Sequence, residues 1–178
     1  MLLFVGASAS GKTELAKYLC EYYNFKKTIT TTTRKIRHNE VKDIDYHFLS
    51  VEEFQEKISS NSFLEYTTYN NNYYGLLKSD IKDNGVVILE PNGANKLIAY
   101  LSEKDLFVVY IEAEAETREK RMLNRLNDKN DIANRIYLDD RLFSISKINR
   151  INMILNNDNV TISELAKKVA GEYLKYNK

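Results

Sequence analysis

The sequence predicts an α/β fold in which helices cover a central parallel sheet, and two observations support this prediction. Apolar runs that are continuous rather than alternating occur at residues 2–5, 86–89, 106–111 and 153–155. Such runs are typical of parallel strands that are buried on both faces. Segments with helical spacing of apolar residues lie between these runs, and this alternation favours a doubly wound parallel sheet.

The chain opens with the strand at 2–5, which leads directly into Gly6 and a glycine-containing turn. A helix is predicted from about residue 12, because Leu15 and Leu19 recur at helical spacing. A strand, a glycine turn and a helix in this order form the opening of a βα unit.

Further helices are predicted at 93–102, 114–126 and 162–176, and two stretches interrupt the alternation. Residues 30–78 combine short Thr- and Tyr-rich strands with a helix at 51–59. Residues 121–141 are charged, with arginines spaced along them. Both stretches are predicted to be insertions in a single domain, whose core is formed by residues 1–29, 79–120 and 142–178.

Composition limits the partners of the chain. Its 178 residues include 26 basic and 25 acidic side chains, a formal net charge of +1. Proteins that hold long nucleic acid are far more basic, so small-molecule nucleotides are the expected partners. Cys20, a lone cysteine, suits a reducing compartment, and no apolar run approaches the roughly 20 residues that cross a bilayer. We expect a cytoplasmic protein with no membrane contact, either a monomer or a homodimer.

Residues 6–13 read GASASGKT and match the pattern G-x-x-x-x-G-K-[ST] in full. Gly6 and Gly11 let the backbone N–H groups converge on phosphate oxygens, and the following helix adds its positive dipole end. The motif predicts a site for ATP or GTP in which Lys12 bridges the β- and γ-phosphates and the Thr13 hydroxyl binds Mg²⁺. The predicted ATP-binding residues of the loop are Gly6, Ala7, Ser8, Ala9, Ser10, Gly11, Lys12 and Thr13.

The loop alone does not distinguish a kinase from a GTPase, an ATPase or a motor. A switch GTPase would also carry the base-reading pattern N/T-K-x-D, which the sequence lacks, and the chain is short for an oligomeric ATPase. Small P-loop kinases remain. Such enzymes need one insertion for the acceptor and another whose arginines close over the transferred phosphoryl group.

Residues 30–37, TTTTRKIR, place two arginines beside a row of hydroxyls, a combination suited to binding phosphate. Residues 30–75 continue with the motifs T-T-R-x-x-R, E-x-x-x-x-D-Y-x-F-x-S-x-x-x-F, F-x-E and Y-Y-G, in that order. On these motifs the chain resembles the guanylate kinase family. Together with the P-loop and the later arginines, the resemblance covers most of the chain.

The resemblance implies ATP-dependent phosphoryl transfer to a nucleoside monophosphate, GMP or dGMP. It also implies a three-layer P-loop kinase fold, with a small mixed α/β acceptor-binding insertion at 30–78 and a helical lid at 121–141. Glu65 matches the carboxylate that accepts hydrogen bonds from guanine N1–H and N2–H, a role suited to its two acceptor oxygens. The residues matched to the acceptor's phosphate are Thr30, Arg34, Arg37, Tyr46 and Tyr74.

Arginines in the second insertion match the family's lid. Arg121 and Arg125 are four residues apart, on one helical face, and the resemblance aligns Arg135 with a third lid arginine. The spacing from Arg125 to Arg135 is one residue shorter than is usual in the family. Asn156, after the strand at 153–155, matches a contact to the adenine of ATP. The catalytic residues implied are Lys12, Arg34, Arg121, Arg125 and Arg135.

Two positions depart from the family pattern. Leu76 follows Y-Y-G, where the family has a Ser or Thr whose hydroxyl meets guanine O6. Residues 90–93 read EPNG where the family has D-x-D-x-Q-G, so Glu90 replaces the first Asp as an acceptor-binding residue, Asn92 replaces the second, and the segment is two residues shorter. Three alternatives therefore stay open: a kinase for another nucleoside monophosphate, a kinase for ribose 1,5-bisphosphate, or a non-catalytic module that binds phosphorylated peptides.

Overall fold

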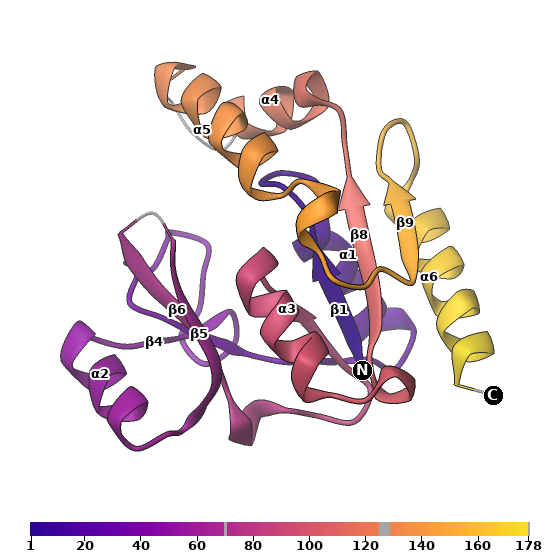
Figure 1. Cartoon of the computed structure of the whole chain (residues 1–178). Coiled ribbons are helices and arrows are strands. Elements are labelled where there is room, and N and C mark those ends of the chain that lie inside the picture. Colours follow the sequence, from indigo (N-terminus) through magenta and orange to yellow (C-terminus); the bar gives the residue numbers. More distant parts are fainter. Residues whose placement is uncertain (70, 125–128, 178) are drawn as a thin grey trace.

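A computed structural model of the chain describes residues 1–69, 71–124 and 129–177, and Figure 1 shows its two sheets and the helices around them. The larger sheet has the strand order β2-β7-β1-β8-β9, and all its pairings are parallel. Its strands are β1 (Leu2–Val5), β2 (Lys26–Lys27), β7 (Gly85–Ile88), β8 (Phe107–Glu112) and β9 (Met153–Asn156).

The smaller sheet has the order β4-β3-β6-β5 and belongs to the insertion that follows β2. Its strands are β3 (Thr30–Thr32), β4 (Tyr46–Phe48), β5 (Phe63–Tyr69) and β6 (Asn72–Leu77). The helices of the described chain are α1 (Lys12–Tyr22), α2 (Val51–Ser59), α3 (Pro91–Tyr100), α4 (Ala115–Leu123), α5 (Lys129–Leu142) and α6 (Ile162–Tyr176).

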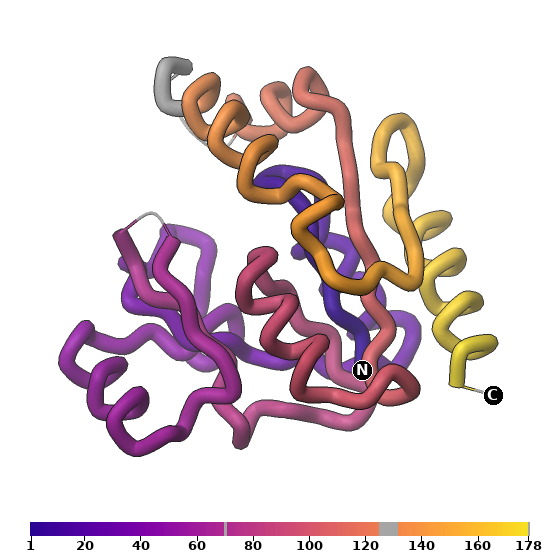
Figure 2. The backbone as a smooth tube through the Cα atoms, in the orientation of Figure 1, coloured from indigo at the N-terminus to yellow at the C-terminus, as the bar shows by residue number. Residues whose placement is uncertain are grey.

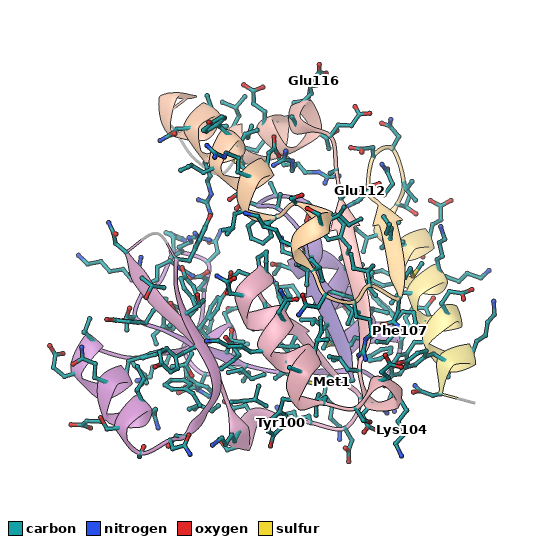
Figure 3. All side chains as sticks on the ribbon, in the orientation of Figure 1. Met1, Tyr100, Lys104, Phe107, Glu112 and Glu116 are labelled. Carbon is teal, nitrogen blue, oxygen red and sulfur yellow. The ribbon has the colours of Figure 1, made fainter. Side chains whose placement is uncertain are left out.

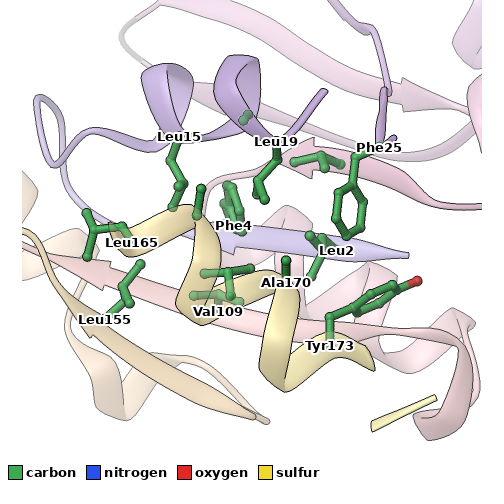
Figure 4. Packing of buried hydrophobic residues seen from close by; sticks show 14 of the residues in the cluster. Leu2, Phe4, Leu15, Leu19, Phe25, Val109, Leu155, Leu165, Ala170 and Tyr173 are labelled. Atoms are coloured by element: carbon green, nitrogen blue, oxygen red, sulfur yellow. The ribbon is translucent and has the colours of Figure 1, made fainter. Parts of the chain in front are cut away.

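The core lies on both faces of β1. Leu2 and Phe4 are fully buried on one face, where they pack against α1 and α6 (Figure 4). Leu3 and Val5 are fully buried on the other face, where they pack with residues of α3. Because neither face of the strand meets water, the sequence shows a continuous apolar run there.

The insertion has a small core of its own. The ring of Phe54 on α2 stacks on Phe63 of β5 and on Tyr73 of β6, with centroids 4.4 and 5.3 Å apart. A capping box between Ser50 and Glu53 begins α2, because each side chain accepts a hydrogen bond from the other residue's backbone N–H. The stacking of Phe54 on Phe63 and Tyr73 holds the β5–β6 hairpin against α2. The hairpin presents its opposite face to the rest of the chain.

The α/β fold with a central parallel sheet and helices on both faces is confirmed, and two details differ from the sequence prediction. Strand β2 joins the edge of the large sheet through Lys26 and Lys27, and no apolar run marked it. The helix predicted at 114–126 ends at Leu123 in the structure, and a second helix, α5, follows from Lys129. Figure 2 shows α5 descending beside the turn after β1. None of the helices in the described ranges has the length and apolar character needed to cross a bilayer.

Candidate nucleotide-binding site

The loop between β1 and α1 has a backbone that requires glycine at two positions. Gly6 has φ +153° and Gly11 has φ +97°. A Cβ at Gly6 would lie 2.1 Å from the carbonyl oxygen of Ile111, and one at Gly11 would lie 2.0 Å from Nδ2 of Asn157. The two glycines therefore let the loop turn tightly against the carboxyl ends of β8, through Gly6, and of β9, through Gly11. Figure 3 labels Phe107 and Glu112 at the two ends of that strand.

Lys12 lies at the start of α1, folded back over the loop. Its Nζ donates hydrogen bonds to the carbonyl oxygens of Gly6 (2.7 Å) and Ala7 (2.6 Å). The same ammonium is 5.8 Å from the ring centroid of Phe143. Thr13 is an exposed residue in the first turn of α1.

Asn157, which sequence reasoning missed, braces the loop from the carboxyl end of β9. It is 2% exposed, and its Nδ2 donates to the carbonyl oxygen of Ser10 at 2.7 Å. Asn156, the predicted adenine contact, is exposed, and its Oδ1 accepts a hydrogen bond from the backbone N–H of Asp158. Neighbouring residues on a strand point in opposite directions, and only Asn157 points at the loop.

Two of the predicted lid arginines reach the P-loop. Arg121 on α4 donates to the carbonyl oxygens of Ala9 (3.2 Å) and Asn157 (2.9 Å). Arg135 on α5 donates through Nε to Oγ of Ser8 at 3.2 Å. Arg125 lies outside the described residues.

A cavity opens between the P-loop, the insertion, the start of α3 and the described part of α5. All seven residues predicted to bind the acceptor line it, together with Lys12 and Arg135. Its lining residues are Ser8, Lys12, Thr30, Arg34, Arg37, Tyr46, Glu65, Thr67, Tyr69, Tyr74, Gly75, Ile88, Leu89, Glu90, Gly93, Arg135 and Phe143.

Arg34 and Arg37 share one carboxylate at this cavity. Nη2 of Arg34 donates to both oxygens of Glu40, at 2.8 and 3.0 Å, and its guanidinium lies 5.4 Å from the ring centroid of Tyr46. Arg37 is 3.9 Å from the same carboxylate, and its side chain is 60% exposed. The cavity therefore has a cationic wall in which Arg34 is held firmly and Arg37 more loosely.

Glu65 forms the opposite, acidic wall and is only 3% exposed. Its Oε2 has no hydrogen-bond partner among the described residues. Burial is the main cause that raises the pKa of its carboxyl group to about 7; Lys96 opposes this shift and the nearby Glu90 adds to it. A buried acceptor without a donor costs free energy unless a ligand supplies one. The carboxyl group is therefore suited to a ligand that presents N–H groups.

The two departures from the family pattern, at Leu76 and at residues 90–93, differ in their relation to the cavity. Leu76 is fully buried in the core cluster that contains Leu97 of α3, and it does not line the cavity. Glu90 lines the cavity but also caps α3, where its carboxylate accepts hydrogen bonds from the N–H groups of Asn92 (3.0 Å) and Gly93 (2.6 Å). Asn92 is exposed and does not line the cavity, so one carboxylate rather than two faces the acceptor from this turn.

Thr67 and Tyr69 are cavity residues that sequence reasoning also missed. Both lie on β5 with Glu65, two and four residues further along, and therefore on the same face of the strand. Alternate residues of a strand share one face, so the position of Glu65 could have predicted that Thr67 and Tyr69 line the same cavity. Thr67 adds a hydroxyl to the wall formed by Glu65.

The fold and the loop at 6–13 define a P-loop nucleotide-binding protein. A family model described as Guanylate kinase matches residues 1–171, and the chain belongs to this family.

Proteins named guanylate kinase are similar to the chain over most of its length. The one from Ehrlichia ruminantium (strain Gardel) is 32% identical over 168 residues, which cover 90% of this chain and 79% of that protein. The one from Mesomycoplasma hyopneumoniae (strain J) is 29% identical and covers 98% of this chain and 96% of that protein. The crystal structure of guanylate kinase from Anaplasma phagocytophilum has the same fold, with a TM-score of 0.70, 20% identity and coverage of 99% of this chain and 85% of that one.

Proposed function

We propose that the chain transfers the γ-phosphoryl group of ATP to GMP or dGMP. The observation that carries the proposal is the buried carboxyl group of Glu65, whose Oε2 lacks a hydrogen-bond partner in the described chain and which lines one cavity with Lys12. Two adjacent N–H donors on the edge of guanine would satisfy both carboxylate oxygens. Relatives that carry the name guanylate kinase support the same acceptor.

On the donor side, the loop residues 6–13 would bind the phosphates of ATP through backbone N–H groups. Lys12 would neutralise charge on the β- and γ-phosphates. The Thr13 hydroxyl would hold Mg²⁺, and the metal ion would supply charge neutralisation on the phosphates. The donor set fits this ion: the described residues contain no group of three or more His, Cys, Asp or Glu side chains that could hold a metal, and Mg²⁺ bound largely by substrate phosphates needs none.

On the acceptor side, Glu65 and Glu90 would hold the base, while the cationic wall would hold the monophosphate. Arginines bind phosphate oxygens in pairs of parallel hydrogen bonds, so Arg34 would change partner from Glu40 to the substrate. The acceptor-phosphate residues in this proposal are Thr30, Arg34, Arg37, Tyr46 and Tyr74.

Between the two sites, Arg121, Arg125 and Arg135 would stabilise the charge that develops on the transferred group. Asn156 would contact the adenine of ATP. We propose the corresponding division of the chain into a core, an acceptor-binding insertion at 30–78 and a lid at 121–141, the core being residues 1–29, 79–120 and 142–178. The enzyme would act in the cytoplasm on small nucleotides, as a monomer or homodimer, with no nucleic-acid or membrane partner.

One observation favours a second candidate, a kinase with a broader acceptor range. Residue 76 is a leucine, which has no hydroxyl to offer to O6 of guanine, and it is buried in the core. The loss of one hydrogen bond typically costs about 1–3 kcal/mol when its partner stays buried. Thr67, on the same face of β5 as Glu65, would supply a hydroxyl from a different position.

The test is ADP release from ATP and Mg²⁺ with a panel of acceptors: GMP, dGMP, IMP, AMP, CMP, UMP and ribose 1,5-bisphosphate. We expect kcat/KM for GMP and dGMP to exceed that for AMP at least about tenfold, the value of one good hydrogen bond. IMP lacks the N2 amino group, so equal rates with IMP and GMP would argue against recognition of that group. Equal rates with every acceptor would refute guanine recognition, and no ADP release with any of them would refute the kinase proposal.

A further inference from the structure

Asp139 is a fully buried carboxylate on α5 that contacts the P-loop. Its Oδ2 accepts a hydrogen bond from the backbone N–H of Ser8 at 2.8 Å. Its Oδ1 accepts one from the hydroxyl of Tyr69 at 2.9 Å. One side chain therefore connects the P-loop, α5 and strand β5 of the insertion.

The N–H group that donates to Asp139 belongs to Ser8, a residue of the P-loop. Backbone N–H groups of a P-loop converge on phosphate oxygens, and a carboxylate is an anion that accepts the same hydrogen bonds. Two anions at one donor repel each other strongly in a site that excludes water. Asp139 and a phosphate group therefore compete for Ser8.

Helix α5 presents opposite charges to the same serine. Arg135 donates through Nε to Oγ of Ser8 at 3.2 Å, one helical turn before Asp139. Residues four apart lie on one face of a helix, so the cation and the anion approach the loop together. An incoming triphosphate would be attracted by Arg135 and repelled by Asp139.

Tyr69 secures the other carboxylate oxygen. Burial and the neighbouring Asp139 both raise the pKa of the Tyr69 hydroxyl, so it keeps its proton and remains a donor. Tyr69 also lines the acceptor cavity. The contact therefore ties the segment that carries the acceptor site to the segment that carries Arg135.

We propose that Asp139 is a positioning residue that occupies a phosphate position of the P-loop before the donor binds, and that the triphosphate of ATP displaces it. The inference rests on the proposed function, because it requires ATP at this loop. It extends that function by making Asp139 a determinant of donor affinity. Displacement breaks the hydrogen bond from the Ser8 N–H to Oδ2 of Asp139, so donor binding removes this contact between α5 and the P-loop.

The test compares the wild type with Asp139→Asn, which keeps the shape of the side chain and removes its charge. The dissociation constant for ATP with Mg²⁺ is measured by calorimetry without an acceptor, and the thermal midpoint is measured with and without ATP. We expect Asp139→Asn to bind ATP about tenfold more tightly, the value of one displaced charged hydrogen bond. Its midpoint without ATP should be lower, and the rise caused by ATP should be larger. A purely structural role would weaken both stability and binding.

Asp140→Asn is the matched control. It removes the same charge one residue further along α5, from a carboxylate that pairs with Arg118 and does not contact Ser8. Its dissociation constant for ATP should stay within about twofold of the wild type, because the Asp140 carboxylate is half-exposed, so solvent and salt screen its charge, and it pairs with Arg118. Equal tightening in both variants would show a general charge effect and overturn the role of Asp139.

Tyr69→Phe provides a second route if Asp139→Asn does not fold. The variant loses the hydrogen bond from the Tyr69 hydroxyl to Oδ1 of Asp139, so Asp139 is easier to displace. ATP should bind about threefold more tightly. An unchanged or larger dissociation constant in the folded variants would overturn the inference while leaving the proposed function intact. A wild type that does not bind ATP would instead refute the proposed function itself, and the inference with it.

Discussion

The carboxyl group of Glu65 lies directly against Gly93 at the start of α3: a Cβ built on that glycine would be 2.7 Å from Oε2 of the glutamate. The side chain of residue 65 has this position only because residue 93 has no side chain. The acceptor pocket therefore depends on a contact between β5 and the first turn of α3, 28 residues further along the chain.

Gly93→Ala should displace the Glu65 carboxyl group and weaken acceptor binding. We expect KM for GMP to rise about tenfold, since one hydrogen bond to a charged group is lost or lengthened, while KM for ATP stays the same. Steady-state kinetics with each substrate varied separately checks this. Gly171→Ala on α6 is the control, because its Cβ would meet nothing within 4 Å. An unchanged KM for GMP in Gly93→Ala would contradict the role given to Glu65.

Glu65 should make the protein less stable as pH rises. Its pKa is about 7 in the folded state, against an ordinary value of 4.5, so below pH 4.5 the group is protonated in both states and does not favour unfolding. Between these values the unfolded state releases its proton first, and the penalty grows to about 3 kcal/mol above pH 7. Urea unfolding of the wild type and Glu65→Gln at pH 5 and pH 8 measures this. The wild type should lose stability relative to the variant at pH 8; parallel curves would rule out the shifted pKa.

The same group should shape the pH dependence of catalysis. Guanine N–H donors favour the ionised carboxylate, so kcat/KM for GMP should rise with pH through about 7, the pKa of the free protein. A rate profile from pH 5.5 to 8.5 with subsaturating GMP and saturating ATP tests this. Glu65→Gln should lack this step, and a variant that retained it would assign the titration to another group.

Lys12→Ala should reduce kcat about 10²- to 10³-fold, the range for removal of one group that stabilises transition-state charge. The lysine donates to carbonyl oxygens of its own loop, so the fold should persist and the thermal midpoint should change little. Lys17→Ala, at an exposed position on the same helix, should retain wild-type kcat. Full activity in Lys12→Ala would remove the loop from the mechanism.

Asn157→Ala should both destabilise the protein and weaken ATP binding. Its buried amide donates to Ser10 in the P-loop, and its loss should cost about 1–3 kcal/mol of unfolding free energy. Asn156→Ala, at the exposed neighbouring position, should raise KM for ATP without lowering the thermal midpoint if it contacts adenine. Calorimetric unfolding and ATP titration of the two variants separate these roles, and equal stability in both would contradict the bracing role of Asn157.

Much of the fold and the P-loop could be predicted because local physics fixes them, whereas the resemblance to a family implied the acceptor residues. The GASASGKT loop needs glycines and a lysine at set positions, and β1 needs an apolar run because both its faces are covered. Strand β2 could not be predicted, since two lysines at a sheet edge bear no pattern. The start of α5 at Lys129 could not be predicted either, because the stretch around it is polar and carries no clear helix-start pattern.

The missed site residues depend on distant contacts. Asp139 meets Ser8 across 131 positions of sequence, and Tyr69 meets Asp139 across 70. No local pattern indicates which acidic residue of a charged helix will be buried. Thr67 is different, because its place two residues after Glu65 on a strand was sufficient to predict a shared face.

Product identification tests the central claim most directly. The protein is incubated with ATP, Mg²⁺ and GMP, and the nucleotides are separated and quantified over time. GDP and ADP should appear in equal amounts, and Lys12→Ala should form neither at a comparable rate. ADP that forms without GDP, or the absence of both products, would contradict that claim.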